Sequence, residues 1–387
     1  MLVPKLRFKE FKEEWKKIKL KDISTDISYG MNSAAIEFDG TNKYIRITDI
    51  DEETSLYSNN PVSPSGSLDD KFLVKENDIL FARTGASTGK SYLYNKTDGK
   101  LYFAGFLIRV NIKKDYNSRF IFEQTKLNKY NNWIKIMSIR SGQPGINSIE
   151  YGNYEFSITH IDEQKKIANV IELVNKKIEL QKRKIEALKI YKGGLIQRIY
   201  NRIWNNKIKM EEILIQKSIR NTNDEIHNVY SVSNKDGFIL QTEQFKDRIV
   251  ASEDTRNYKV VAKNDFAYNP ARINVGSIAR MKQNIKGIIS PMYICFKCNE
   301  KILPEYLEYF FESSKFTYEM SKRLEGSVRM CLSYESMLNI PIELPNKNEQ
   351  EKISNFLNSL SNKIKLEEKK FRELNKLKKG LLQKMFI

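Results

Sequence analysis

Cysteine, histidine and long apolar runs are scarce in this chain of 387 residues, and each scarcity excludes a class of function. Three cysteines cannot supply the disulfide framework of a small secreted domain. The two histidines, His160 and His227, poorly supply a Ser/His or Cys/His catalytic couple. No apolar stretch approaches the roughly 18–20 residues that cross a bilayer, and the first five residues lack the apolar core of a signal peptide. We therefore expect a cytoplasmic protein that makes no membrane contact.

Two short motifs imitate chemical sites but lack the pattern that the chemistry needs. Two residues separate Cys295 from Cys298, yet no second pair or nearby histidine accompanies them. The apolar stretch 292–296 around them instead predicts a place in the core. Segment 85–91 resembles a phosphate-binding P-loop, but it has three residues between its glycines where the P-loop has four. We expect no catalytic residue, metal or bound cofactor in this chain.

The formal charge of +18 is distributed unevenly along the chain. Lys and Arg exceed Asp and Glu by 11 within the segments 161–200 and 346–387, which make up about a fifth of the sequence. Such a basic excess favours a polyanionic partner, with double-stranded DNA among the candidates. The alternative is a lysine-rich helix surface that is merely solvated. Charge alone does not separate DNA, RNA and an acidic protein surface.

The segments 163–200 and 349–386 are two copies of one sequence, with 14 identities in 38 ungapped positions. Each begins with Glu-Gln and ends near a Gly-Leu-(Ile/Leu)-Gln string. The first copy begins at position 163 and the second at position 349, so the period is far too long for a solenoid repeat. The sequence therefore indicates that a whole domain and its following helix have been duplicated.

Apolar residues in both copies recur with an average spacing of 3.5, which predicts helices that pack against another helix. Polar residues interrupt this helix-pairing seam at matching places, first at Gln181 and Glu367 and again at Lys192 and Lys378. The match favours an antiparallel pair within one chain, and a homodimeric coiled coil is the alternative. The predicted seam consists of Ile167, Ile171, Val174, Ile178, Ile185, Leu188, Ile353, Leu357, Leu360, Ile364, Phe371 and Leu374.

The predicted length of the helices suggests a spacer. An uninterrupted helix of about 30 residues is roughly 45 Å long, which corresponds to about 13 base pairs of DNA. Gly193, Gly194 and Gly380 are expected to break or end the helices near their C-termini.

The globular parts of the chain are duplicated as well. Segment 71–81 resembles segment 258–268, and a polar loop follows each. Alternating and helical stretches in both copies predict an α+β fold, in which two mixed α/β domains are held apart by an antiparallel pair of long helices. The predicted boundaries are 1–160 for the first domain, 161–200 for the central helix, 201–345 for the second domain and 346–387 for the C-terminal helix.

Three segments resemble the specificity subunit of type I restriction–modification enzymes: 4–15, 77–85 and 345–350. The duplicated helix with its Gly-Leu-(Ile/Leu)-Gln ending is similar to the spacer of that family. The resemblance covers essentially the whole chain, including its internal symmetry. One departure is that Thr159 stands before the first Glu-Gln where the second copy has the more usual Pro345, which leaves the direction of the first helix open.

The resemblance implies a non-catalytic bacterial DNA reader. Its domains 1–160 and 201–345 would be target recognition domains, each recognising one half of a split, asymmetric site in double-stranded DNA. Its helices would dock two methyltransferase subunits, and two restriction/translocase subunits would add ATP-driven translocation and cleavage. S-adenosylmethionine, ATP and magnesium would then be bound by those partners.

Base readout requires loop side chains that form paired hydrogen bonds, where Arg favours guanine and Asn or Gln favours adenine. Each candidate could instead be a turn residue or a surface ion-pair partner. Two other functions remain open, an adaptor that binds nucleic acid without sequence preference and a nuclease with an unrecognised site. The candidates are Arg83, Thr84, Ser87, Thr88, Lys90, Arg140 and Gln143 in the first domain, and Asn269, Arg272, Asn274, Arg323 and Arg329 in the second.

Overall fold

The structure divides into two compact units that each contain one domain and parts of both long helices. The computed structural model describes residues 3–58, 60–204, 206–234, 236–244, 254–326 and 330–387. Unit 1 contains Met1–Gln181 and Lys370–Ile387, and unit 2 contains Lys182–Lys369. Within the described ranges, none of the helices combines the length and apolarity that a membrane crossing requires.

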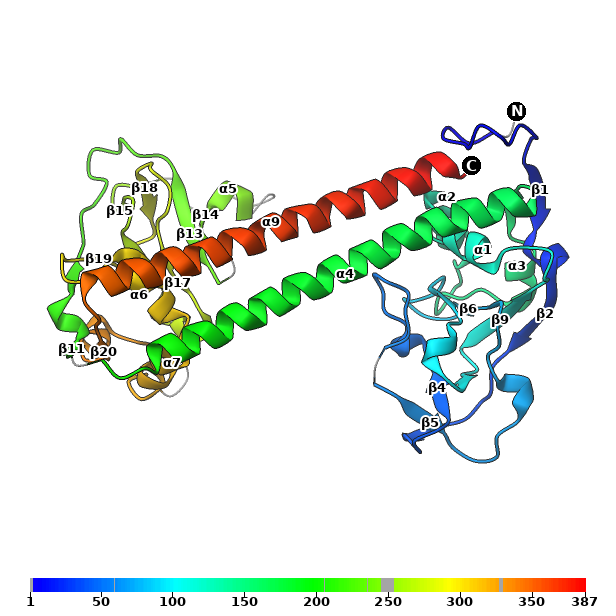
Figure 1. The fold of residues 1–387 in the computed structure, drawn as a ribbon, viewed down its shortest axis with the longest axis horizontal. Helices are drawn as coiled ribbons and strands as arrows, with labels where there is room; N and C mark the ends of the chain where they lie inside the picture. The colour runs from blue at the N-terminus through cyan, green and yellow to red at the C-terminus, as the bar shows by residue number, and fades with distance from the viewer. Residues whose placement is uncertain (1–2, 59, 205, 235, 245–253, 327–329) are drawn as a thin grey trace. The chain divides into compact units, whose positions relative to one another are not determined.

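Two long helices dominate the trace in Figure 1, α4 (Ile161–Tyr200) and α9 (Lys347–Met385). They contain 40 and 39 residues, so each is roughly 60 Å long at 1.5 Å per residue. Each helix is longer than the predicted length of about 30 residues.

The expectation that Gly193, Gly194 and Gly380 break or end the helices is wrong, because all three lie inside helical turns. A helical glycine costs about 1 kcal/mol relative to alanine. The turns beyond the glycines bury Tyr200 and Leu382 in the domain cores, and burying one such side chain contributes roughly 1.5–3 kcal/mol. Packing therefore outweighs the local preference of glycine.

The helices pair antiparallel within each unit. In unit 1, the first turns of α4 share a core with the last turns of α9, where Ile167 and Ile171 lie among Leu382 and Met385. In unit 2, the end of α4 shares a core with the beginning of α9, where Ile196 packs with Leu357. The predicted pairing within one chain is confirmed.

The domain of unit 1 is built on a four-stranded sheet with the order β2-β9-β6-β7, whose pairs are all antiparallel. A β1–β10 pair joins the two ends of the domain, and short β3–β5 and parallel β4–β8 pairs complete it. Its strands are β1 (Lys16–Lys19), β2 (Ser24–Tyr29), β3 (Ala35–Glu37), β4 (Lys43–Ile45), β5 (Val62–Pro64), β6 (Asp78–Ala82), β7 (Ser91–Leu93), β8 (Leu101–Phe103), β9 (Leu107–Ile112) and β10 (Glu155–Ile158), and its helices are α1 (Ser118–Gln124), α2 (Asn128–Met137) and α3 (Ser148–Gly152).

Unit 2 repeats this plan. Its sheet β12-β19-β16-β17 has the same order and pairing as the main sheet of unit 1, and β11–β20 corresponds to β1–β10. A second sheet, β14-β13-β18-β15, contains a parallel β13–β18 pair that corresponds to β4–β8. Its elements are β11 (Lys207–Lys209), β12 (Leu214–Gln216), β13 (Val229–Ser233), β14 (Gly237–Leu240), α5 (Gln241–Gln244), β15 (Lys259–Val261), β16 (Phe266–Tyr268), β17 (Ile278–Arg280), β18 (Gly287–Ile289), β19 (Ile294–Cys298), α6 (Pro304–Phe311), α7 (Ser314–Ser321), α8 (Tyr334–Leu338) and β20 (Pro341–Glu343).

Each domain receives the end of the helix that begins in the other copy. Phe386, at the end of the chain, stacks on Phe120 of α1 with a 5.0 Å ring separation and also contacts Trp15. At the matching place in unit 2, Tyr200 at the end of α4 lies 5.0 Å from Tyr306 of α6, centroid to centroid. Tyr200 and Phe386 are the same position of the two copies, and Phe120 and Tyr306 are related by the same offset. The duplication is therefore preserved in the packing.

Candidate nucleic-acid interface

The glutamine of the Glu-Gln pair at the start of each long helix fixes the helix to its own domain. Gln164 accepts a hydrogen bond from the Asn117 N–H and donates one to the Thr159 carbonyl, at 2.9 and 2.7 Å. Gln350 accepts from the Leu303 N–H at 2.9 Å and donates to the Pro345 carbonyl at 3.0 Å. Thr159 stands where the second copy has Pro345, and its carbonyl accepts the same hydrogen bond from the helix glutamine.

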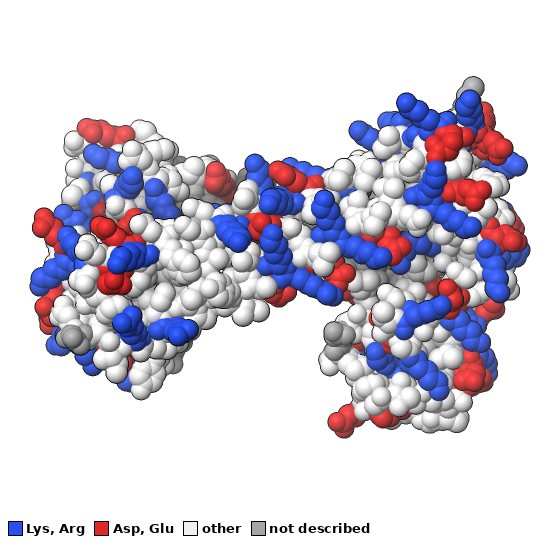
Figure 2. Space-filling view, viewed as in Figure 1, with Lys and Arg blue, Asp and Glu red and all other residues white. Residues whose placement is uncertain are grey.

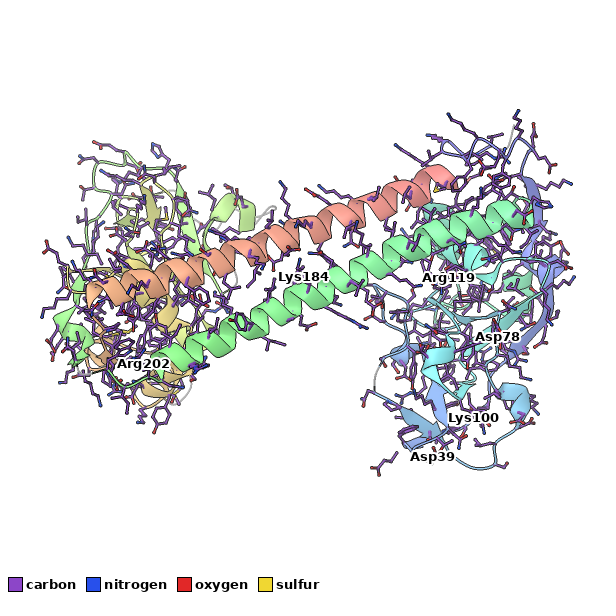
Figure 3. The ribbon with its side chains drawn as sticks, viewed as in Figure 1. Asp39, Asp78, Lys100, Arg119, Lys184 and Arg202 are labelled. Atoms are coloured by element: carbon purple, nitrogen blue, oxygen red, sulfur yellow. The ribbon has the colours of Figure 1, made fainter. Side chains whose placement is uncertain are left out.

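A second duplicated motif shapes the strand that leads to each polar loop. Asn77 and Asn264 both adopt φ = 69°, a left-handed conformation that asparagine tolerates better than most residues. Asp78 and Asp265, which follow, each accept a hydrogen bond at 2.7 Å from the N–H three residues earlier. The resulting turn sets the direction of β6 and β16. Asp78 is labelled in Figure 3.

The two polar loops predicted in the first domain lie side by side. The Gly85 N–H donates to the Pro144 carbonyl, and the Ile146 N–H donates to the Arg83 carbonyl, both at 2.9 Å. Thr88 closes the turn between β6 and β7 through its hydroxyl, which donates to the Gly85 carbonyl at 2.7 Å. The loop candidates brought together at one end of the main sheet, half-buried or exposed, are Arg83, Thr84, Ser87, Thr88, Lys90 and Gln143.

The corresponding loops of the second domain are joined in the same way. The Leu332 N–H donates to the Pro270 carbonyl at 3.1 Å. Asn269 uses its side-chain oxygen to accept from the Ala271 N–H at 3.1 Å, whereas Arg272 and Asn274 are exposed. Arg329 lies outside the described residues.

The candidate arginines differ in whether they already form an ion pair with a carboxylate of this chain. Arg140 forms two hydrogen bonds with Glu150, at 2.6 and 2.7 Å, and Arg323 forms one with Glu319 at 2.6 Å. Among the described residues, Arg83 and Arg272 have no carboxylate partner. The guanidinium of Arg83 instead lies over the ring of Tyr29, 4.8 Å from its centroid. A paired arginine must give up a charge-assisted bond before it can form another, so Arg83 and Arg272 are the more available for contact with a ligand.

Next to Arg83 lies a hollow of about 750 Å³ that sequence reasoning missed. Its lining includes Tyr29, Asn32, Arg46 and Phe106 in addition to Arg83. The segments 29–33 and 104–106 meet here because Gly30 packs directly on the backbone of Ala104, where a Cβ would come within 2.2 Å of the carbonyl oxygen. In the sequence, the local sign of this hollow is an aromatic residue beside a glycine in each of the two segments.

The twelve predicted seam residues are all buried or half-buried in the long helices. The polar residues that interrupt the seam make specific contacts. The Nζ atom of Lys184 lies 3.1 Å from the carboxylate of buried Glu367, and Figure 3 labels Lys184 on α4. Lys192 pairs with Glu312 at 2.8 Å and lies over the ring of Tyr309.

Lys378 occupies the matching place in unit 1. Burial raises the pKa of the Glu123 carboxyl, and the charge of Lys378 opposes that shift. The offset that relates Lys192 to Lys378 also relates Glu123 to Tyr309. The two seam lysines therefore approach equivalent helices, α1 and α6, as a register-specifying contact would.

Lysine and arginine side chains gather over the long helices on the face shown in Figure 2. Among the lysines of the long helices, Lys177 and Lys363 are exposed and are the same position of the two copies. Exposed lysines provide positive charge that carries no base specificity, which suits phosphate contact rather than base readout.

Two of the three cysteines lie in a strand that packs in the second domain. Cys295 and Cys298 belong to β19, and burial raises the pKa of each thiol to about 12. The described part of the chain brings together no group of three or more His, Cys, Asp or Glu side chains that could hold a metal ion.

These features define an internally duplicated α+β protein in which two copies of one domain exchange helix ends and display divergent polar loops. A family model of the type I restriction modification DNA specificity domain matches residues 12–189 and 207–376. The chain belongs to this family.

Relatives support the assignment. The type I restriction enzyme MjaVIII specificity subunit of Methanocaldococcus jannaschii is 24% identical over 352 residues, which covers 81% of this chain and 79% of the relative. The crystal structure of a type I restriction–modification S subunit from M. genitalium has a TM-score of 0.61 at 16% identity, with 100% and 99% of the two chains covered. A chain from a study of complex assembly and conformational transition in the type I system has a TM-score of 0.55 at 13% identity, with 96% and 97% covered. Both structures share the fold.

Proposed function

We propose that this chain is the DNA sequence-recognition subunit of a type I restriction–modification complex. Its two domains each bind one half of a bipartite, asymmetric site in double-stranded DNA, and the chain itself is not catalytic. It docks two methyltransferase subunits and two restriction/translocase subunits, which carry S-adenosylmethionine, ATP and magnesium.

The observation that carries the proposal is duplication of the scaffold with divergence of the loops. Gln164 and Gln350 make the same hydrogen bonds, and Asn77 and Asn264 adopt the same φ. The loops that follow differ in sequence, since 83–90 reads Arg-Thr-Gly-Ala-Ser-Thr-Gly-Lys and 269–276 reads Asn-Pro-Ala-Arg-Ile-Asn-Val-Gly. Two identical supports that present different side chains suit a protein that reads two different half-sites.

The long helices suit the roles of spacer and docking surface. Each is a continuous helix with a repeated basic excess, which would neutralise phosphates of the non-specific spacer and make affinity sensitive to salt. Large apolar side chains also remain exposed, with Leu173 and Leu180 at 66% and 65% in unit 1 and Phe356 and Leu366 at 49% and 53% in unit 2. Leu180 and Leu366 are the same position of the two copies, as the docking of two identical subunits requires.

Methylation mapping tests the proposal. The chain is co-expressed with a methyltransferase subunit of the same system, and modified adenines are located by single-molecule sequencing. We expect one motif of two specific halves separated by a spacer of unspecified sequence. Exchanging residues 1–160 for the corresponding domain of a relative should change one half only. Methylation without a bipartite motif, or a change in both halves, would contradict the proposal.

A second candidate is an adaptor that binds nucleic acid without sequence preference, which the excess of 11 positive charges on the repeated segments favours. Competition by random duplex DNA separates the two. An adaptor loses its labelled duplex equally to any competitor, whereas a specificity subunit retains its selected site.

A further inference from the structure

The hollow beside Arg83 in the first domain contains an arginine held in place without a charged partner. Its guanidinium lies over Tyr29, and the Tyr29 hydroxyl accepts a hydrogen bond from the Ser148 N–H at 3.0 Å. The Arg83 backbone is held on both sides, because its N–H donates to the Phe106 carbonyl at 3.0 Å and its carbonyl accepts from Ile146. Contacts with three separate segments therefore fix the position of the Arg83 backbone and the direction of its side chain.

The other arginine of the hollow is not available. Arg46 donates to both carboxylate oxygens of Asp49, each at 2.9 Å, which fully engages one edge of its guanidinium. The Nε of Arg83 is buried and has no partner among the described residues. The guanidinium is planar, and one that is held by stacking loses less side-chain entropy on binding than a mobile one.

We infer that Arg83 reads a guanine of the first half-site by donating to the O6 and N7 atoms of the base while it remains stacked on Tyr29. This inference rests on the proposed function and identifies the hollow as the base-reading site of the first domain. An arginine fork matches the two acceptors that guanine presents in the major groove. Phe106, which is 60% exposed, gives the rim an apolar surface that the adjoining base pair can cover.

The sequence position of Arg83 carries no side-chain donor in the second domain. Counting from Asn77 and Asn264, the position of Arg83 is occupied by Pro270. Ile108 pairs with Phe81 and Ile294 pairs with Tyr268, so the position of Phe106 is occupied by Met292, which is 61% exposed. An apolar surface suits contact with a thymine methyl group and does not require guanine. The guanine requirement that Arg83 imposes should therefore belong to the first half-site only.

The test is selection from a random duplex library by the full chain in complex with its methyltransferase subunits. Arg83→Lys keeps the charge but lacks the fork, so the preference for guanine at one position of one half-site should fall roughly tenfold. Arg83→Gln should shift that position toward adenine, which a purely structural role of Arg83 would not produce. Arg109→Lys is the matched control, because Arg109 is not among the candidate readers and is already paired with Asp26 at 2.7 Å, and it should leave all preferences unchanged.

The other half-site reports in the same experiment that each variant is folded. Retained guanine preference in both Arg83 variants overturns the inference while leaving the proposed function intact. If the unmodified complex selects no bipartite site, the proposed function fails, and the inference fails with it.

Discussion

Adding seven residues to each long helix should move the two recognised half-sites apart, if the helices act as the spacer. Seven residues correspond to two repeats of the 3.5-residue seam, so the apolar positions stay in line. The additions are repeats of 178–184 after Lys184 and of 364–370 after Lys370, which are the same positions of the two copies. Matching additions preserve the antiparallel pairing found in each unit.

The expected change follows from helix and DNA dimensions. Seven residues lengthen a helix by about 10 Å, which corresponds to about three base pairs of B-DNA. Each added base pair also rotates the second half-site by roughly 35° about the DNA axis. Because twisting opposes the full translation, we expect the spacer to lengthen by two or three base pairs while both half-site sequences stay the same.

Single-molecule sequencing of modified adenines measures the spacer directly. A control with the addition in α4 alone displaces the end of α4 by about 10 Å relative to α9. The two helices then cannot both keep their ends in the domain cores, and we expect a loss of methylation and a lower melting temperature. An unchanged spacer in the doubly lengthened protein, with methylation preserved, would refute the role of the helices as a ruler.

Three further predictions concern stability and reactivity. Phe386→Ala removes a buried ring from the core of unit 1 and should lower the free energy of unfolding by about 3–5 kcal/mol in chemical denaturation. Phe356→Ala, at an exposed position of α9, is the control and should lower it far less. Equal losses would contradict the assigned packing. Gln350→Ala leaves the Leu303 N–H without its acceptor and should cost about 1–3 kcal/mol, with Gln383→Ala as the exposed glutamine control. At pH 8, a thiol pKa of about 12 leaves roughly one thiol in ten thousand as the reactive thiolate. Cys295 and Cys298 should therefore react with a thiol reagent only after denaturation. Rapid labelling of both in the native protein would show that they are not in the core.

The long helices and their pairing could be predicted from sequence because their signal is local and repeated. The seam of Ile167, Ile171 and Leu357 follows from spacing alone, and duplication showed that the two helices belong together. The lengths could not be predicted, because Gly193 and Gly380 are poor helix residues whose cost is outweighed by packing against distant parts of the chain.

The candidate loops were only partly predictable. Sequence placed Arg83 and Gln143 in polar loops, and the structure brings those loops together through backbone hydrogen bonds. The same reasoning could not separate Arg83 from Arg140, because the difference lies in Glu150 and Tyr29, which no spacing rule connects to them.

The sequence by itself determined that one domain and its helix occur twice and that the helices pair, since periodicity and repetition are properties of the chain read in order. Only the tertiary structure decided that each helix ends in the core of the other copy's domain, which arginines are free of carboxylates and where the hollow beside Arg83 lies. Those features depend on contacts between residues far apart in sequence, and such contacts form only when the whole domain has packed.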